Sequence, residues 1–197
     1  LFNNGAYGQP GALEDLPTHA LKAQFESNVF GWHELTKQVI PVMRQQGHGR
    51  IIQCSSVLGF VSMAYRGAYN ASKYAIEGLT DTLRLELKSA NIAVILLQPG
   101  PINTQFRANA LTAFQDNIAI DTSVHKVQYH QQIERLTSEK SNAPFTLEPI
   151  DVTQALIHAL ESKRPKLRYR ITTPTKLFAV FKRILPARWL DYLLAKG

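Results

Sequence analysis

The run Ile92-Ala93-Val94-Ile95-Leu96-Leu97 places the strongest constraint on how this chain can fold. Six apolar residues in succession, with no polar residue at alternate positions, are typical of a strand that is buried on both faces. Such strands belong to parallel sheets that have helices on both sides. Long helical patterns precede this run and follow it, which predicts an α/β fold with a doubly wound parallel sheet.

The remaining elements can be predicted from apolar periodicity and from Pro, Gly and capping residues. Three further strands are expected at Leu1–Asn4, Arg50–Cys54 and Lys166–Thr173. Helices are expected at residues 18–46 (with Thr18 as N-cap and a kink at Pro41), 68–90, 148–162, 176–185 and 187–195.

The chain of 197 residues is expected to form one domain, residues 1–197, with four parts. Residues 1–104 would hold the catalytic core, and residues 148–173 the last helix and strand. Residues 105–147 are polar and carry no strand pattern, so they are expected to form a substrate lid with a surface helix near residues 124–136. Residues 174–197 would form a basic helical tail.

Positive charge is concentrated at the C-terminal end of the chain. The net charge is +7, yet residues 163–197 contain 10 Lys and Arg against one acidic residue. The body lacks a basic excess, which argues against nucleic-acid binding. Two interpretations of the tail stay open: residues 176–195 contact an anionic membrane peripherally, or Phe178, Phe181 and Leu185 cover the substrate pocket or a neighbouring subunit.

Three residue types suited to proton transfer lie around the junction between the second strand and the next helix. Ser56 follows the strand, and Tyr69 and Lys73 are four residues apart, which puts both on one helix face. A lone Tyr-x-x-x-Lys spacing is common by chance. Asn28 adds weight, because it is an amide on the apolar stripe of an earlier helix and needs buried partners.

Taken in order, these motifs resemble the short-chain dehydrogenase/reductase family, whose fold is Rossmann-like. The resemblance is carried by Asn3-Asn4-Gly5, Asn28, Ser55-Ser56, Tyr69-x-x-x-Lys73 and Pro99-Gly100-Pro101-Ile102-x-Thr104. The chain looks closest to bacterial oxidoreductases related to 17β-hydroxysteroid and retinol dehydrogenases.

The resemblance implies a role for each residue of a catalytic set. Tyr69 would be the acid/base, with its pKa lowered by Lys73 and by the nicotinamide cation. Lys73 would also hold the nicotinamide ribose, and Ser56 would stabilise charge on the substrate oxygen. Asn28 would anchor a water that links Lys73 to solvent.

The same resemblance implies a cofactor and partners. NADP(H) is expected, with NAD(H) as the alternative, and the substrate would be an aldehyde, ketone or secondary alcohol. Besides Tyr69 and Lys73, the expected cofactor-binding residues are Asn4, Gly5, Pro99, Gly100, Ile102 and Thr104. A homodimer or tetramer is also implied.

The chain departs from the family pattern in two places. It has Asn-Asn-Gly-Ala where the family has Asn-Asn-Ala-Gly, and it lacks the glycine-rich turn with which the family opens. The chain is therefore expected to be the C-terminal part of a longer one. The alternative to an enzyme is a catalytically impaired Rossmann-like fragment that serves as an oligomerising or regulatory binding module.

Other classes of function have less support in the sequence. The six histidines are scattered without ligand spacing, so no metal site is expected. Ser56 lacks the Gly-x-Ser-x-Gly motif of hydrolases. The single cysteine, Cys54, and the absence of a long apolar run predict a cytoplasmic protein.

Overall fold

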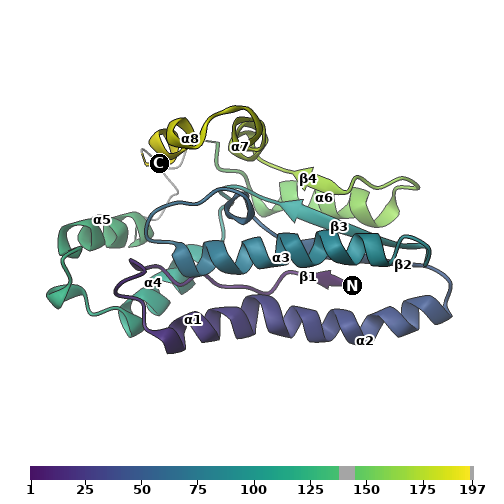
Figure 1. Cartoon of the computed structure of the whole chain (residues 1–197), viewed down its shortest axis with the longest axis horizontal. Coiled ribbons are helices and arrows are strands. Elements are labelled where there is room, and N and C mark those ends of the chain that lie inside the picture. Colours follow the sequence, from purple (N-terminus) through teal and green to yellow (C-terminus); the bar gives the residue numbers. More distant parts are fainter. Residues whose placement is uncertain (138–144, 196–197) are drawn as a thin grey trace.

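The computed structural model describes residues 1–137 and 145–195, in which four parallel strands form one sheet in the order β1-β2-β3-β4 (Figure 1). The strands are β1 (Phe2–Asn3), β2 (Gly49–Cys54), β3 (Ile92–Gln98) and β4 (Arg168–Arg170). The predicted parallel sheet is confirmed, with the strands somewhat shorter than expected at its two edges. Because all four strands point the same way, their carboxyl ends share one edge.

Alternate residues of β2 and β3 face opposite sides of the sheet, and both sides are covered. On one side, Ile51 and Val94 pack with Met43, which comes from the helix before β2, and with Leu87, at the end of the helix after it. On the other side, Ile52, Ile95 and Leu97 pack with the last helix before β4, through Ala159. This two-sided burial explains the uninterrupted apolar run of β3.

Eight α-helices are described, and α1–α2 and α3 run along one layer of the molecule (Figure 1). Their bounds are α1 Thr18–Phe25, α2 Gly31–Gln45, α3 Gly67–Glu86, α4 Phe106–Asn117, α5 Lys126–Thr137, α6 Pro149–Glu161, α7 Thr173–Ile184 and α8 Ala187–Leu194.

The helix predicted over residues 18–46 is interrupted. A π-helical turn, Glu26–Phe30, separates α1 from α2, and it contains Asn28. The prediction that Thr18 is the N-cap is wrong: Pro17 has the extended backbone of the cap, with no side-chain cap bond. Thr18 is the first helical residue instead, because the fixed φ of Pro17 suits the turn into the helix.

The later helices differ from the predictions mainly at their ends. α3 ends at Glu86 rather than near residue 90, and Asn91 has a positive φ of 52° just before β3. α6 starts with a reciprocal capping box between Glu148 and Asp151. α7 begins three residues earlier than expected, because the side chain of Thr172 caps it by accepting from the Thr175 N–H.

Residues 105–147 were expected to be a lid with one surface helix, and their described part holds two α-helices. α5 lies close to its predicted place, but it is anchored: the Tyr129 ring is fully buried. Its hydroxyl accepts from the Ala12 N–H at 3.0 Å and donates to the Asp15 carboxylate. Residues 138–144 of the predicted lid lie outside the described residues.

The last two helices lie together on one side of the molecule, at the top of the view in Figure 1. Phe178 of α7 and Leu194 of α8 pack against Val57, Leu58 and Val61, which follow β2. The tail therefore covers this loop with one of its sides. Within the described residues, none of the helices has the length and apolar composition that crossing a bilayer requires.

Candidate active site

The loops that follow β1, β2 and β3 meet at the carboxyl edge of the sheet. Asn4 and Gly5 follow β1, Ser55 and Ser56 follow β2, and Pro99 begins the loop after β3. The Val57 N–H donates to the Pro99 carbonyl at 2.8 Å, which joins the second and third loops. Ligands of open α/β sheets bind at this edge.

Helix α3 lies next to these loops and carries Tyr69 and Lys73 on one face. The Lys73 side chain is buried, and its Nζ donates to the Cys54 carbonyl at 2.8 Å. The same Nζ lies 5.5 Å from the centroid of the Tyr69 ring and 4.4 Å from that of Trp32. The ammonium is thus held between two aromatic rings at the end of β2.

Tyr69 is enclosed more than the sequence suggested, and this changes its acidity. Burial raises the pKa of the Tyr69 phenol well above its usual value, and a hydrogen bond from Ser56 opposes the rise. The expectation that Lys73 lowers the pKa of Tyr69 is therefore wrong for the protein alone. The physical reason is that desolvation of the phenolate outweighs an ammonium whose donated bond points to the Cys54 carbonyl. Tyr69 is a neutral phenol at pH 7.

Burial lowers the pKa of the Lys73 ammonium to about 8, with Glu77 acting in the opposite direction. Glu77 lies one turn further along α3, and burial raises its pKa. Its Oε1 accepts from the Gln98 amide at 2.9 Å. A buried lysine and a partly buried carboxyl group therefore follow Tyr69 on one side of α3, at i+4 and i+8.

Three side chains from α1, the π-helical turn and α2 hold the loop after β1. Gln24 accepts from the Gln9 N–H at 2.7 Å and donates to the Tyr7 carbonyl at 2.8 Å. The Asn28 amide bonds both the N–H and the carbonyl of Tyr7, and it also donates to Ser72 Oγ at 3.2 Å. Trp32 Nε1 donates to the Gly5 carbonyl at 2.9 Å.

The structure thus brings Ser56, Tyr69 and Lys73 together and links Asn28 to the same helix through Ser72. The Ser72 hydroxyl donates to the Tyr69 carbonyl at 2.8 Å. The predicted partners of the Asn28 amide are found, and they are the loop and α3. Its role in anchoring a water stays a prediction.

Sequence reasoning missed two aromatic residues of the site. Trp32 lies beside Lys73 and fixes Gly5, and its position four residues after Asn28 was the available signal. Phe106 of α4 packs edge-to-face on Tyr69, with ring centroids 5.2 Å apart. A Cβ at Gly8 would come within 2.8 Å of the Phe106 ring, so glycine there permits this contact. Nothing in the sequence pointed to Phe106.

Several of the residues expected to bind a dinucleotide are open to solvent, and their role in binding it stays a prediction. Nothing lies within 4 Å of the position that a Cβ on Gly5 would take, and Asn4, Gly5 and Thr104 are exposed at the carboxyl edge. An ammonium has three donors, and one bond from Lys73 to a described residue leaves capacity for sugar hydroxyls. Packing also explains why residue 100 is a glycine, because a Cβ at this position would lie 2.1 Å from Thr172 Oγ1. Pro99 and Ile102 are half-buried beside it.

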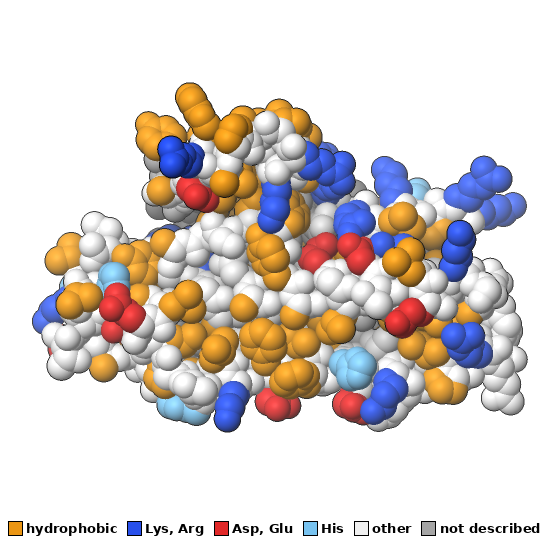
Figure 2. All heavy atoms as spheres, viewed as in Figure 1, with side chains coloured by type: hydrophobic (Ala, Val, Ile, Leu, Met, Phe, Trp, Pro, Cys, Tyr) orange, Lys and Arg blue, Asp and Glu red, His pale blue; other side chains and the backbone are white. Residues whose placement is uncertain are grey.

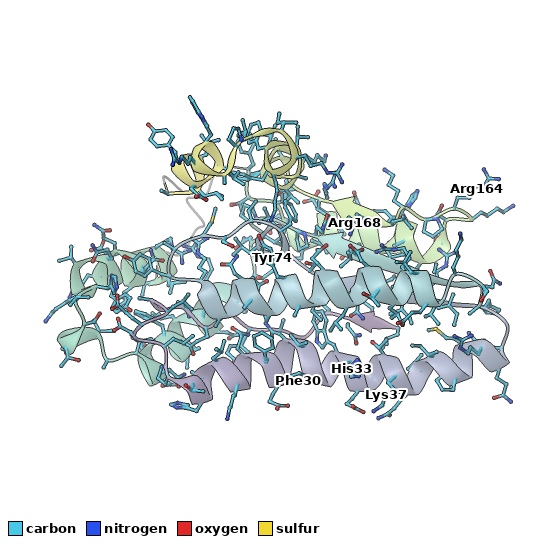
Figure 3. The ribbon with its side chains drawn as sticks, in the orientation of Figure 1. Phe30, His33, Lys37, Tyr74, Arg164 and Arg168 are labelled. Atoms are coloured by element: carbon cyan, nitrogen blue, oxygen red, sulfur yellow. The ribbon has the colours of Figure 1, made fainter. Side chains whose placement is uncertain are left out.

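No group of three or more His, Cys, Asp or Glu residues in the described part of the chain is arranged to hold a metal ion. Figure 3 shows several charged side chains instead at the outer surface, among them Lys37 on α2 and Arg164 before β4. Arg168 points toward α3, where it pairs with Asp81.

Comparison with known proteins agrees with this geometry. The family model described as short chain dehydrogenase matches residues 1–114, more than half of the chain and all of the site built by β1–β3 and α3. The chain belongs to the short-chain dehydrogenase family. The fold class predicted from the sequence is the fold of this family.

Curated members of the short-chain dehydrogenase family match most of this chain. The uncharacterized oxidoreductase YbbO of Escherichia coli is 39% identical over 98% of this chain, which covers 66% of that protein. Human retinol dehydrogenase 8 is 33% identical over 85% of this chain, which covers 54% of that protein. The chain spans about two thirds or less of the length of these relatives.

A solved structure supports the fold. The short chain dehydrogenase from Burkholderia cenocepacia, solved in complex with NADP, aligns with a TM-score of 0.72 at 22% identity. The alignment covers 99% of this chain and 70% of that one. At this identity the likeness concerns the arrangement of strands and helices.

Proposed function

We propose that the protein is an oxidoreductase that transfers hydride between NADP(H) and an aldehyde, ketone or secondary alcohol, with NAD(H) as the alternative cofactor. Family membership supports the class of reaction. The observation that carries the proposal is that the half-buried Tyr69 and the buried Lys73 lie beside Ser56, at the edge of the sheet where α/β folds bind ligands.

The raised pKa of Tyr69 keeps the phenol protonated, which is the form that donates a proton in carbonyl reduction. A bound nicotinamide would supply the hydride. Tyr69, a neutral phenol, would donate its proton to the carbonyl oxygen, and Ser56 would donate a hydrogen bond to the same oxygen as charge develops. The carbonyl gains one hydride and one proton and becomes an alcohol.

The remaining residues would position the cofactor and renew the proton. Lys73 would donate to the nicotinamide ribose, and Asn28 would hold a water between Lys73 and solvent. The loops after β1 and β3 would line the cofactor through Asn4, Gly5, Pro99, Gly100, Ile102 and Thr104. The described helices of residues 105–147 would cover the substrate, with Phe106 against Tyr69.

The test uses the full-length protein with NADPH and a panel of aldehydes. Tyr69→Phe is expected to lower kcat by about 10²- to 10⁴-fold, the usual contribution of a positioned general acid. NADPH binding, followed by its fluorescence, should persist in the variant. Failure of the wild-type protein to oxidise or to bind either NADPH or NADH would reject the proposal. Binding without turnover would favour the regulatory-module alternative.

We also propose a homodimer or tetramer, formed through the layer of α1, α2 and α3. Figure 2 shows hydrophobic side chains gathered along this face. Phe30, Leu79 and Tyr74 expose 50%, 47% and 37% of their surface. Figure 3 places Phe30 and Tyr74 on neighbouring helices of the same face. Light scattering after size exclusion should give a multiple of the monomer mass, and Phe30→Lys should reduce it; a monomeric wild-type protein would reject the idea.

For the tail, both earlier interpretations have support on different sides of α7 and α8. Phe178 packs inward near Tyr69. Ile184, Trp189 and Tyr192 expose more than half of their surface beside the basic residues of the same helices. Peripheral contact of residues 176–195 with anionic membranes is a proposal that sedimentation with liposomes tests, and binding without dependence on anionic lipid would reject it. The cytoplasmic location likewise stays a prediction.

A further inference from the structure

Arginine side chains from three different elements line a small pocket beside Tyr69. The pocket has a volume of about 120 Å³, and its walls include Tyr69, Phe106 and Leu58. Arg66 precedes α3, Arg107 lies in the first turn of α4, and Arg135 lies near the end of α5. A larger open hollow of about 700 Å³ is lined by residues such as Tyr65 and Tyr74, and Tyr69 is not among them.

Arg66 is the least compensated of the three. Its Nη1 donates to the Met63 thioether at 2.7 Å, and sulfur is a weak acceptor. Within residues 1–137 and 145–195, no carboxylate forms an ion pair with Arg66. Burial lowers the pKa of its guanidinium, which means that the charge is held at a cost. A desolvated cation of this kind is stabilised when an anion joins it.

The other two guanidinium groups add to the same positive field. Burial, followed by the charges of Arg66 and Arg107, lowers the pKa of Arg135 to about 10. Arg66 and Arg107 therefore lie close enough to Arg135 to disfavour its charge. Arg107 also donates to the backbone carbonyl of Arg135, which fixes α4 against α5 at the pocket. An anion bound by Arg66 would also lie close to the other two guanidinium groups.

The position and size of the pocket limit what kind of anion fits. Tyr69 is one of its walls, so a molecule in the pocket lies against the Tyr69 side chain. The volume is below the range of about 300–1,000 Å³ usual for drug-sized ligands. A short chain with a carbonyl at one end and a charged group at the other suits this space.

We propose that the substrate of the Tyr69 site is a short oxo-acid, whose carbonyl faces Tyr69 and whose carboxylate is bound by Arg66, with Arg107 and Arg135 beside it. This inference rests on the proposed function and names its substrate class. Reduction converts the carbonyl to an alcohol by one hydride and one proton, and the carboxylate is unchanged. Guanidinium binds carboxylate through two parallel N–H donors, which gives orientation as well as affinity.

The test compares two aldehydes of equal chain length, 4-oxobutanoate and butanal, in NADPH oxidation by the full-length protein. The wild-type kcat/KM is expected to be at least about 10-fold higher for 4-oxobutanoate, through a lower KM. In Arg66→Gln the ratio of the two kcat/KM values should fall by about 10- to 100-fold, the range of a charge-assisted hydrogen bond. Arg66→Lys should keep part of the preference.

Arg44→Gln is the matched control, since Arg44 is an exposed arginine of α2 away from the pocket. This variant removes the same charge, and its ratio should stay within about two-fold of wild type. Equal kcat/KM for the two aldehydes in the wild-type protein would overturn the inference. So would an equal fall of the ratio in Arg44→Gln, because the effect would then come from net charge.

Calorimetry of succinate binding separates this inference from the proposed function. Succinate carries the carboxylate but no carbonyl to reduce. If the protein oxidises no NADPH but binds succinate in a way that Arg66→Gln abolishes, the anion site stands and the proposed reaction fails. If it reduces butanal but shows neither the preference nor Arg66-dependent binding, the reaction stands and the anion site fails. Circular dichroism of each variant confirms that it is folded.

Discussion

Replacing Lys73 with methionine should stabilise the folded protein at neutral pH, although it removes a residue of the proposed catalytic set. The Lys73 ammonium is buried between the Trp32 and Tyr69 rings, and desolvation lowers its pKa from 10.5 to about 8. In the unfolded chain the same group keeps the usual value. Folding at pH 7 therefore has to force a protonated ammonium into a site that disfavours its charge.

The sign and size of the effect follow from the two pKa values. Because the folded-state pKa lies below the unfolded-state pKa, the penalty is complete below pH 8 and is relieved as the pH rises toward 10.5. At 1.36 kcal/mol per pKa unit, the penalty at pH 7 is about 3 kcal/mol, and about 2 kcal/mol of it is relieved by pH 9.5. Methionine leaves the Cys54 carbonyl without its donor, which costs about 1 kcal/mol at either pH.

Urea unfolding of wild type and Lys73→Met at pH 7.0 and pH 9.5 checks the argument. The variant should be more stable at pH 7.0 by about 2 kcal/mol, and this advantage should nearly vanish at pH 9.5. Tyr69 and Cys54 also titrate differently in the folded and unfolded states, and comparison at each pH cancels most of their contribution. A stability difference that is the same at both pH values would refute the reasoning.

Three further variants test single contacts by the free energy of unfolding in urea. Gly100→Ala should lower the free energy of unfolding by about 1–3 kcal/mol, because its Cβ would overlap Thr172 Oγ1. Gly78→Ala, whose Cβ would enter open space on α3, should raise it by about 0.5–1 kcal/mol. Similar changes in the two variants would contradict the packing argument. Tyr129→Phe should cost about 1–3 kcal/mol because it removes a buried hydroxyl with two partners, and no loss would mean that α5 is not anchored there. Trp32→Phe should cost about 1–2 kcal/mol through its lost N–H donor; an unchanged stability would count against that bond.

The sheet and its covering helices could be predicted because their residues obey local rules. The apolar run Ile92–Leu97 predicts a strand that is buried on both faces. The structure pairs this strand along both of its edges, with β2 and with β4. Ser56, Tyr69 and Lys73 could be chosen together because a strand end and a helical spacing of four fix their relative positions. Gly31 directly follows the break at Glu26–Phe30, but one glycine in a helical pattern does not predict a π-helical turn. The turn depends on contacts with the loop after β1, which the sequence does not show.

The parts of the site that the sequence did not predict depend on contacts between distant residues. Phe106 meets Tyr69 from 37 positions further along the chain, and Tyr129 meets Ala12 and Asp15 across more than a hundred residues. In the protein without cofactor the pKa of Tyr69 is raised where the sequence predicted that Lys73 would lower it, because a sequence shows the neighbouring charge but not the extent of desolvation. Burial is a property of the assembled fold.

The π-helical turn between α1 and α2 fixes how many residues this part of the chain can have. Gln24, Asn28 and Trp32 all reach the loop after β1, yet in a regular α-helix the first and last would point about 80° apart. The wider turn takes up part of that rotation. A regular α-helix could bring the same three side chains to one face only with one residue fewer, at spacings of i, i+4 and i+7. An alignment gap of one residue inside Glu26–Phe30 would therefore mark a relative in which α1 and α2 form one unbroken helix that still holds the loop after β1.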